Sequence, residues 1–149
     1  IDPTDVEMLN EYYFETMHHE FAHILHQKKN YPTEYNQISA ADYSSTGWQN
    51  RTEQQAWKLG FVTPYAGMEP QEDFVEVIAN YLVKPDGFWE NMLANAGTEG
   101  ATKIQTKFDM VKEWLMTAWN IDIDELRTII IRRSGDIDSI LNEKITYNE

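Results

Sequence analysis

The stretch His19-Glu20-Phe21-Ala22-His23 decides how the rest of the chain is interpreted. Apolar residues recur around it at helical spacing, which predicts a helix over residues 5–29. On a helix, His19 and His23 lie about 40° apart on one face and can bind one metal ion. Glu20 projects about 100° from His19, beside such an ion, where its carboxylate can take a proton from a bound water. The stretch therefore predicts a zinc site on His19 and His23 with Glu20 as general base.

Capping patterns and turn formers divide the rest of the chain into further helices. Thr4 and Glu7 have the spacing of a capping box, and so do Thr52 and Gln55. Pro70 suits the first turn of another helix. Beyond residues 5–29, the expected helices span residues 52–59, 70–84, 87–96, 102–119 and 124–133.

Glycines and turn-rich segments separate these helices. Gly60 is placed as a C-terminal cap, and Gly97 and Gly100 are placed as breaks before the helix of residues 102–119. Residues 33–50 and 60–68 have no clear period and could hold short strands. Since strand candidates are few, we expect a mainly α fold.

The composition indicates one globular domain. The 149 residues contain 42% hydrophobic residues, enough to bury a core, so residues 1–149 are interpreted as a single domain. A net charge of −13 argues against binding to nucleic acid or to anionic lipid surfaces. There is no cysteine, so a metal site must use histidine and carboxylate ligands. No apolar run is long enough for a transmembrane helix.

Histidine alone cannot complete the predicted zinc site. All four histidines lie in the first predicted helix. His18 points about 100° away from His19, and His26 lies roughly 10 Å beyond it along the axis. The metzincin pattern also fails, because it requires glycine and histidine where the chain has His26 and Lys29. We therefore interpret His18 and His26 as residues that support the site or lie on the surface, and expect a carboxylate as the third ligand.

The helix that starts at Pro70 offers the carboxylate. Glu72 and Glu76 lie about 40° apart at the margin of its apolar face, whereas Asp73 shares the expected solvent side with Asn80 and Lys84. A carboxylate that faces the core needs a charged partner, and a zinc ion is such a partner. The alternative is that these acids form an ordinary solvated face.

The spacing of the two acids assigns them different roles. In a Glu-x-x-x-Glu pair on a following helix, the first carboxylate can bind zinc while the second accepts a hydrogen bond from a ligating histidine. Glu72 lies 49 residues beyond His23. We therefore predict His19, His23 and Glu72 as metal ligands and Glu76 as their outer hydrogen-bond partner.

Three stretches resemble a known family. Residues 18–27 (HHEFAHILHQ), 60–66 (GFVTPYA) and 72–79 (EDFVEVIA) are similar to the Bacteroidetes zinc-binding metallopeptidases known as substrate-import-associated zinc metallohydrolase lipoproteins. The match covers roughly residues 12–83. The arrangement also resembles the catalytic domain of anthrax lethal factor, a gluzincin. The resemblance implies a zincin-like, HExxH-type catalytic subdomain with Zn²⁺ as its cofactor.

The resemblance carries further implications. In lethal factor, a tyrosine seven residues before the ligand glutamate assists the reaction, and Tyr65 holds that place here. Tyr65 is therefore a candidate donor to the developing oxyanion, or else a packed loop aromatic. The family implies a lipid-anchored location in the cell envelope beside outer-membrane nutrient importers. It also implies an upstream sheet, so we expect the chain to be a carboxy-terminal fragment that lacks it.

These features favour one function and leave two alternatives. The favoured function is a zinc metallopeptidase that hydrolyses peptide bonds with a zinc-activated water, with a peptide or protein as substrate. One alternative is a catalytically silent zincin-fold module that binds its ligand at an importer. The other is a structural zinc site, for which Asp42 or Tyr43 would supply the fourth ligand.

Overall fold

The computed structural model describes residue 2 and residues 4–146, and its regular secondary structure is helical. The helices are α1 (Val6–Lys28), α2 (Glu53–Lys58), α3 (Pro70–Val83), α4 (Phe88–Asn95), α5 (Gly97–Trp119) and α6 (Ile123–Thr146), with short 3₁₀ helices η1 (Thr33–Gln37), η2 (Gly47–Asn50) and η3 (Tyr65–Gly67). No strand forms among the described residues. The prediction of a mainly α fold is therefore confirmed.

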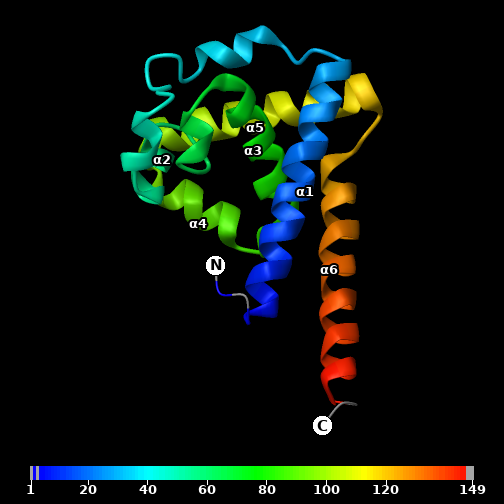
Figure 1. Cartoon of the computed structure of the whole chain (residues 1–149). Helices are drawn as coiled ribbons and strands as arrows, with labels where there is room; N and C mark the ends of the chain where they lie inside the picture. Colours follow the sequence, from blue (N-terminus) through cyan, green and yellow to red (C-terminus); the bar gives the residue numbers. More distant parts are fainter. Residues whose placement is uncertain (1, 3, 147–149) are drawn as a thin grey trace.

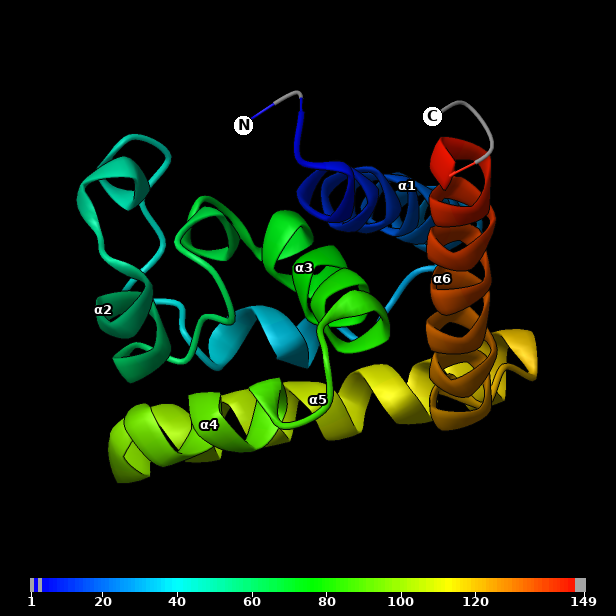
Figure 2. The ribbon, with the colours of Figure 1, turned by 90° about the horizontal axis from the view of Figure 1, so that it is seen from below.

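Helix α3 lies at the centre of the molecule (Figures 1 and 2). It packs against α1, α5 and the first part of α6, while α2 and α4 cover α5. Arg127 of α6 ties the end of α3 to this packing, because its Nη1 donates to the carbonyl oxygens of Tyr81 and Lys84. The carboxy-terminal part of α6 extends beyond the other helices (Figure 1). No helix in the described ranges combines the length and apolar character needed to cross a bilayer.

The ends of α2 and α3 follow the predicted signals. Thr52 caps α2 in a full capping box with Gln55, and Gly60 follows with a φ of +88°, which glycine adopts without strain. Pro70 is the first residue of α3, which ends before Pro85. The start of α1 differs from the prediction. Its cap is Asp5 and not Thr4, because the Asp5 carboxylate accepts from the Met8 amide at 3.0 Å.

Two other predicted boundaries were wrong, the start of α5 and the end of α6. Helix α5 begins at Gly97, and Gly100 lies within it where the helix meets the backbone of α2. A Cβ atom on Gly100 would lie 2.3 Å from the Trp57 carbonyl oxygen, so this glycine permits close packing and does not break the helix. Helix α6 continues past Arg133 to Thr146, through Gly135. Glycine in a helix costs only about 1 kcal/mol, which the surrounding residues can offset.

The turn-rich segments do not form the short strands that the sequence allowed. Residues 33–50 contain η1 and η2, and residues 60–68 contain η3. A strand in either segment would need a partner for its backbone hydrogen bonds. The described chain offers no such strand. The backbone in these segments bonds locally, as from Tyr35 to Pro32 and from Gly67 to Pro64, and a single bond from the Ser44 amide to the Gly67 carbonyl oxygen joins the two segments.

The prediction that Asp73 faces solvent is wrong. Every residue from Asp73 to Asn80 is buried, because α5 covers the side of α3 that was assigned to solvent. Lys107 of α5 meets the buried carboxylate, with 2.7 Å between its Nζ and Asp73 Oδ2. The same Nζ donates to Ser39 Oγ and to the Gly60 carbonyl, so all three ammonium protons have acceptors. Tyr43 OH donates a further hydrogen bond to Asp73, at 2.6 Å.

Replacement of Lys107 should destabilise the fold strongly. Lys107→Met leaves the Asp73 carboxylate buried without its charged partner, which should lower the free energy of unfolding by about 3–5 kcal/mol. Urea unfolding followed by circular dichroism measures this loss. Lys112→Met removes an exposed ion pair to Asp124 and should leave the urea midpoint close to that of the wild type. Equal midpoints for the Lys107 and Lys112 variants would contradict the role given to the buried pair.

Candidate metal centre

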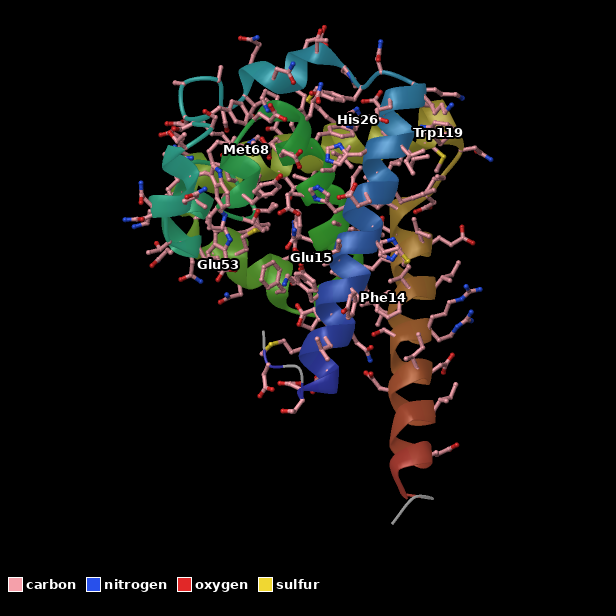
Figure 3. The ribbon with its side chains drawn as sticks, in the orientation of Figure 1. Phe14, Glu15, His26, Glu53, Met68 and Trp119 are labelled. Atoms are coloured by element: carbon pink, nitrogen blue, oxygen red, sulfur yellow. The ribbon has the colours of Figure 1, made fainter. Side chains whose placement is uncertain are left out.

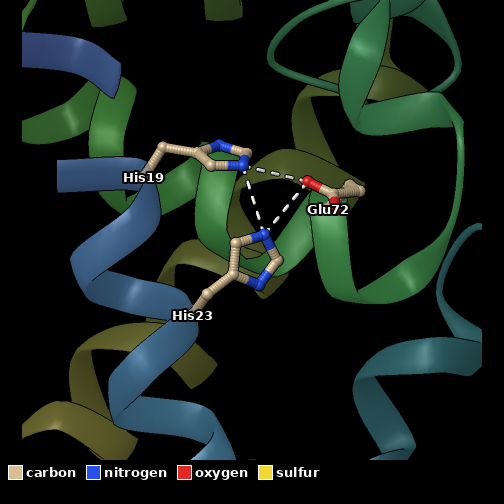
Figure 4. Close-up of side chains that lie close together, drawn as sticks. All are labelled: His19, His23 and Glu72. Carbon is tan, nitrogen blue, oxygen red and sulfur yellow. Dashed lines mark hydrogen bonds and ion pairs between the residues drawn. The ribbon is translucent and has the colours of Figure 1, made fainter. Parts of the chain in front are cut away.

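The candidate metal centre lies where α1 packs against the start of α3. His19 and His23 are one helical turn apart and both project from α1 towards α3, and Glu72 in the first turn of α3 points back between them (Figure 4). The first turn of a helix favours an anionic side chain, because the free amide groups there carry partial positive charge. Helical spacing thus brings His19 and His23 to one face of α1, and the packing of α3 against α1 brings Glu72 to them.

The three side chains converge through one atom each. His19 Nε2 lies 3.0 Å and His23 Nε2 lies 3.2 Å from Glu72 Oε2, and the two Nε2 atoms are 3.2 Å apart. Ligand atoms around a tetrahedral zinc ion are separated by about 3.3 Å, given bonds of about 2.0–2.1 Å. The side chains are 13–16% exposed, so the cluster is largely buried but open to solvent on one side. The donor set fits zinc and supplies three of the four ligands that a tetrahedral ion takes.

Glu76 lies behind His19. Its Oε2 is 3.4 Å from His19 Nδ1, and its carboxylate accepts hydrogen bonds from Thr63 Oγ1 at 3.0 Å and from Asn80 Nδ2 at 3.3 Å. A carboxylate can only accept, so the proton of a neutral His19 belongs on Nδ1 and the lone pair on Nε2. This is the arrangement predicted for Glu76 from its spacing to Glu72.

The charge at the site favours a cation. Burial lowers the pKa of His19, but the hydrogen bond and charge of Glu76 and the charges of Glu72 and Glu20 outweigh it, so the pKa is raised overall. In the absence of a metal, a proton on His19 would relieve the repulsion among the converging lone pairs. A metal ion would relieve the same repulsion, which is a second reason why the site suits a divalent cation.

The two predicted catalytic side chains flank the cluster without joining it. Glu20 follows His19 on α1 and is exposed. Tyr65 lies in η3, with its ring centroid 6.0 Å from that of His19 and 5.0 Å from that of Trp48. Burial and the neighbouring carboxylates, Glu72 first, raise the pKa of Tyr65, so its hydroxyl stays protonated and able to donate.

The remaining histidines and the proposed fourth protein ligands lie outside the cluster. His18 stacks on Phe14, and burial lowers its pKa. Tyr43 is engaged with Asp73, and the Asp42 carboxylate lies 3.6 Å from Lys103 Nζ. Asp42 and Tyr43 therefore do not complete a structural zinc site in this structure.

Sequence reasoning missed two residues that hold Glu76 in place. Thr63 lies in an irregular segment, and no spacing rule connects it to the helix that carries Glu76. Asn80 was assigned to the solvent side together with Asp73, yet it is buried and also donates to the Glu76 carbonyl oxygen at 2.9 Å. Residues four apart on a helix are neighbours, so the position of Asn80 four residues after Glu76 could have identified this hydrogen bond.

Comparison with known proteins identifies the family. A family model described as "Putative zinc-binding metallo-peptidase" matches residues 1–124. The chain belongs to this metallopeptidase family. Both the predicted family and its predicted cofactor, zinc, agree with that description.

A solved structure supports the family assignment. The chain is similar to one described as "a putative zinc-binding metallo-peptidase from Bacteroides caccae ATCC 43185", with 52% sequence identity and a TM-score of 0.85. The match covers 93% of this chain and 53% of that chain, so the chain spans about half the length of the solved one. No curated protein matches the chain.

The raised pKa of His19 predicts how zinc affinity depends on pH. His19 must be neutral to offer its Nε2 lone pair, so protons compete with zinc once the pH falls below the raised pKa. Zinc affinity should then fall by about tenfold per pH unit for each proton displaced. Competition with a chromophoric chelator at a series of pH values measures this dependence.

A charge-removing variant provides the control for that titration. Glu76→Gln keeps an acceptor for His19 Nδ1 but removes the charge that raises the pKa. The fall in zinc affinity should therefore move to lower pH in this variant. An unchanged pH profile would contradict the electrostatic role of Glu76.

Proposed function

We propose that this chain is a zinc metallopeptidase of the HExxH gluzincin type, which hydrolyses peptide bonds with a zinc-activated water. One observation carries the proposal: two imidazole nitrogens and one carboxylate oxygen converge at 3.0–3.2 Å, and Glu20 follows directly after the first ligand. Three protein ligands with an open fourth position are typical of catalytic zinc, whereas structural zinc sites are closed by four protein ligands.

The chain's own residues divide the work of the reaction. His19, His23 and Glu72 would hold the ion, which when bound supplies a Lewis acid that polarises the scissile carbonyl and acidifies a water molecule. Glu20 accepts a proton as the water oxygen adds to the carbonyl carbon. Glu20 then delivers that proton to the leaving amine as the carbon–nitrogen bond breaks.

Tyr65 has a separate role in this scheme. Its hydroxyl donates a hydrogen bond to the oxygen that gains negative charge during the addition. The raised pKa supports this role, because a protonated phenol is needed to donate. The edge-on contact with Trp48 helps to fix the ring beside His19.

The lipid-anchored envelope location and the importer partners remain predictions that rest on the family resemblance. The same is true of the role of this chain as one domain of a longer protein with an upstream sheet. A catalytically silent module that keeps the zinc site is the alternative outcome of the experiments below.

Removal of the general base should abolish hydrolysis while zinc binding is retained. Glu20→Gln keeps the size of the side chain but cannot accept the proton, so kcat/KM should fall by about 10²–10⁴-fold. Peptide-library cleavage measured by mass spectrometry, together with zinc content, separates the two effects. Glu7→Gln is the matched control, because Glu7 is also exposed on α1 but lies in its first turn. A wild-type chain that binds zinc yet cleaves no peptide would favour the silent module.

Removal of the Tyr65 hydroxyl should affect kcat more than KM. Tyr65→Phe keeps the ring that packs on Trp48 and removes the donor, so kcat should fall by about 10²–10³-fold. Steady-state kinetics on a peptide found in the library measures the change. An unchanged kcat would show that Tyr65 is a packed loop aromatic.

A further inference from the structure

His26 is a buried histidine that the proposed mechanism does not use. It lies three residues after His23, near the carboxy-terminal end of α1 (Figure 3), and is only 6% exposed. Its Nε2 lies 2.9 Å from His23 Nδ1, within ordinary hydrogen-bond distance. The sequence placed His26 too far along the helix to share the metal, but its side chain reaches the nitrogen of His23 that faces away from the metal cluster.

The direction of this hydrogen bond follows from the chemistry of His23. Its Nε2 points at His19 Nε2 and Glu72 Oε2, so it must carry a lone pair if it is to bind a metal. A neutral imidazole with a lone pair on Nε2 carries its proton on Nδ1. A ligating histidine usually donates that proton to a nearby acceptor, which fixes the ring. In the described part of the chain, His26 Nε2 is the atom placed to accept it.

The surroundings of His26 hold it as an acceptor. The rings of Tyr31 and Phe74 meet it edge-on, with centroid distances of 5.7 Å and 6.4 Å, and stack on each other at 4.3 Å. Tyr31 is fixed in turn, because its hydroxyl donates to Asn36 at 2.9 Å. These packed rings hold His26 in the orientation that places its Nε2 2.9 Å from His23 Nδ1.

We propose that His26 is a positioning residue, which accepts the Nδ1 proton of His23 and so directs the His23 Nε2 lone pair at the metal. This inference rests on the proposed zinc site. It implies that the two ligating histidines have unlike outer partners: His19 faces the Glu76 carboxylate, whereas His23 faces a neutral imidazole. The neutral partner fixes the ring of His23 without a further negative charge beside Glu72 and Glu76.

Two substitutions separate the role of His26 as a hydrogen-bond acceptor from its role in packing. His26→Leu fills part of the space but cannot accept, whereas His26→Gln places an amide oxygen near the position of Nε2. His18→Gln is the control, because His18 lies on the same helix and stacks on Phe14 away from the cluster. The dissociation constant for zinc is measured by chelator competition at one neutral pH. Far-UV circular dichroism and the urea midpoint of each metal-free variant control for folding.

We expect zinc affinity to fall only in the variant that lacks a hydrogen-bond acceptor for His23 Nδ1. Zinc affinity should fall by about 10–100-fold in His26→Leu, whereas His26→Gln and His18→Gln should stay within a few-fold of the wild type. If His26→Leu and the wild type bind zinc equally, the inference is overturned and the proposed function stands. If the wild type itself binds no zinc, the proposed function fails, and this inference fails with it.

A spectroscopic measurement tests the hydrogen bond itself and does not depend on the leucine variant. In the zinc-loaded wild type, ¹⁵N-resolved NMR should show His23 with its proton on Nδ1 and a slowly exchanging, downfield ring N–H signal. The signal should persist in His26→Gln. A His23 ring whose Nδ1 proton exchanges rapidly in the wild type, or whose Nδ1 is unprotonated, would overturn the proposal even if His26→Leu failed to fold.

Discussion

Two imidazole nitrogens and one carboxylate oxygen face one another across the contact between α1 and α3, and this convergence constrains the rest of the site. Three lone pairs at 3.0–3.2 Å repel one another unless a cation lies among them. The hydrogen bond and charge of Glu76, with the charges of Glu72 and Glu20, outweigh the effect of burial and raise the pKa of His19, so in the metal-free chain a proton can supply the positive charge. The fold therefore places three candidate ligand atoms for a cation between α1 and α3.

Helix α3 can carry this site because it is fixed on several sides. Glu72 and Asp73 are neighbours in its first turn but serve opposite faces: Glu72 points to α1, whereas Asp73 is buried against Lys107 of α5. The buried ion pair uses every proton of the lysine, so the start of α3 is anchored where the ligand must be placed. A displacement of this turn would move Glu72 Oε2 away from both histidines.

The candidate ligands were predictable because helical spacing determines the relative positions of the two histidines, and of Glu72 and Glu76 on the second helix. His19 and His23 lie on one face of any helix that contains them, and the scarcity of other histidines required a carboxylate. The prediction for Asp73 was wrong because a helix with one apolar face normally has a solvent side, whereas α3 is enclosed by its neighbours. The links from Thr63 and Lys107 could not be predicted, because they join segments whose contact depends on the tertiary fold.

The most direct test of the account is the position of zinc in a crystal. Diffraction data collected on both sides of the zinc absorption edge, from the chain crystallised with one equivalent of zinc at neutral pH, locate the ion by its anomalous signal. The account predicts a peak about 2.0–2.2 Å from His19 Nε2, His23 Nε2 and Glu72 Oε2. No peak at this position, or a peak held by other residues, would contradict it.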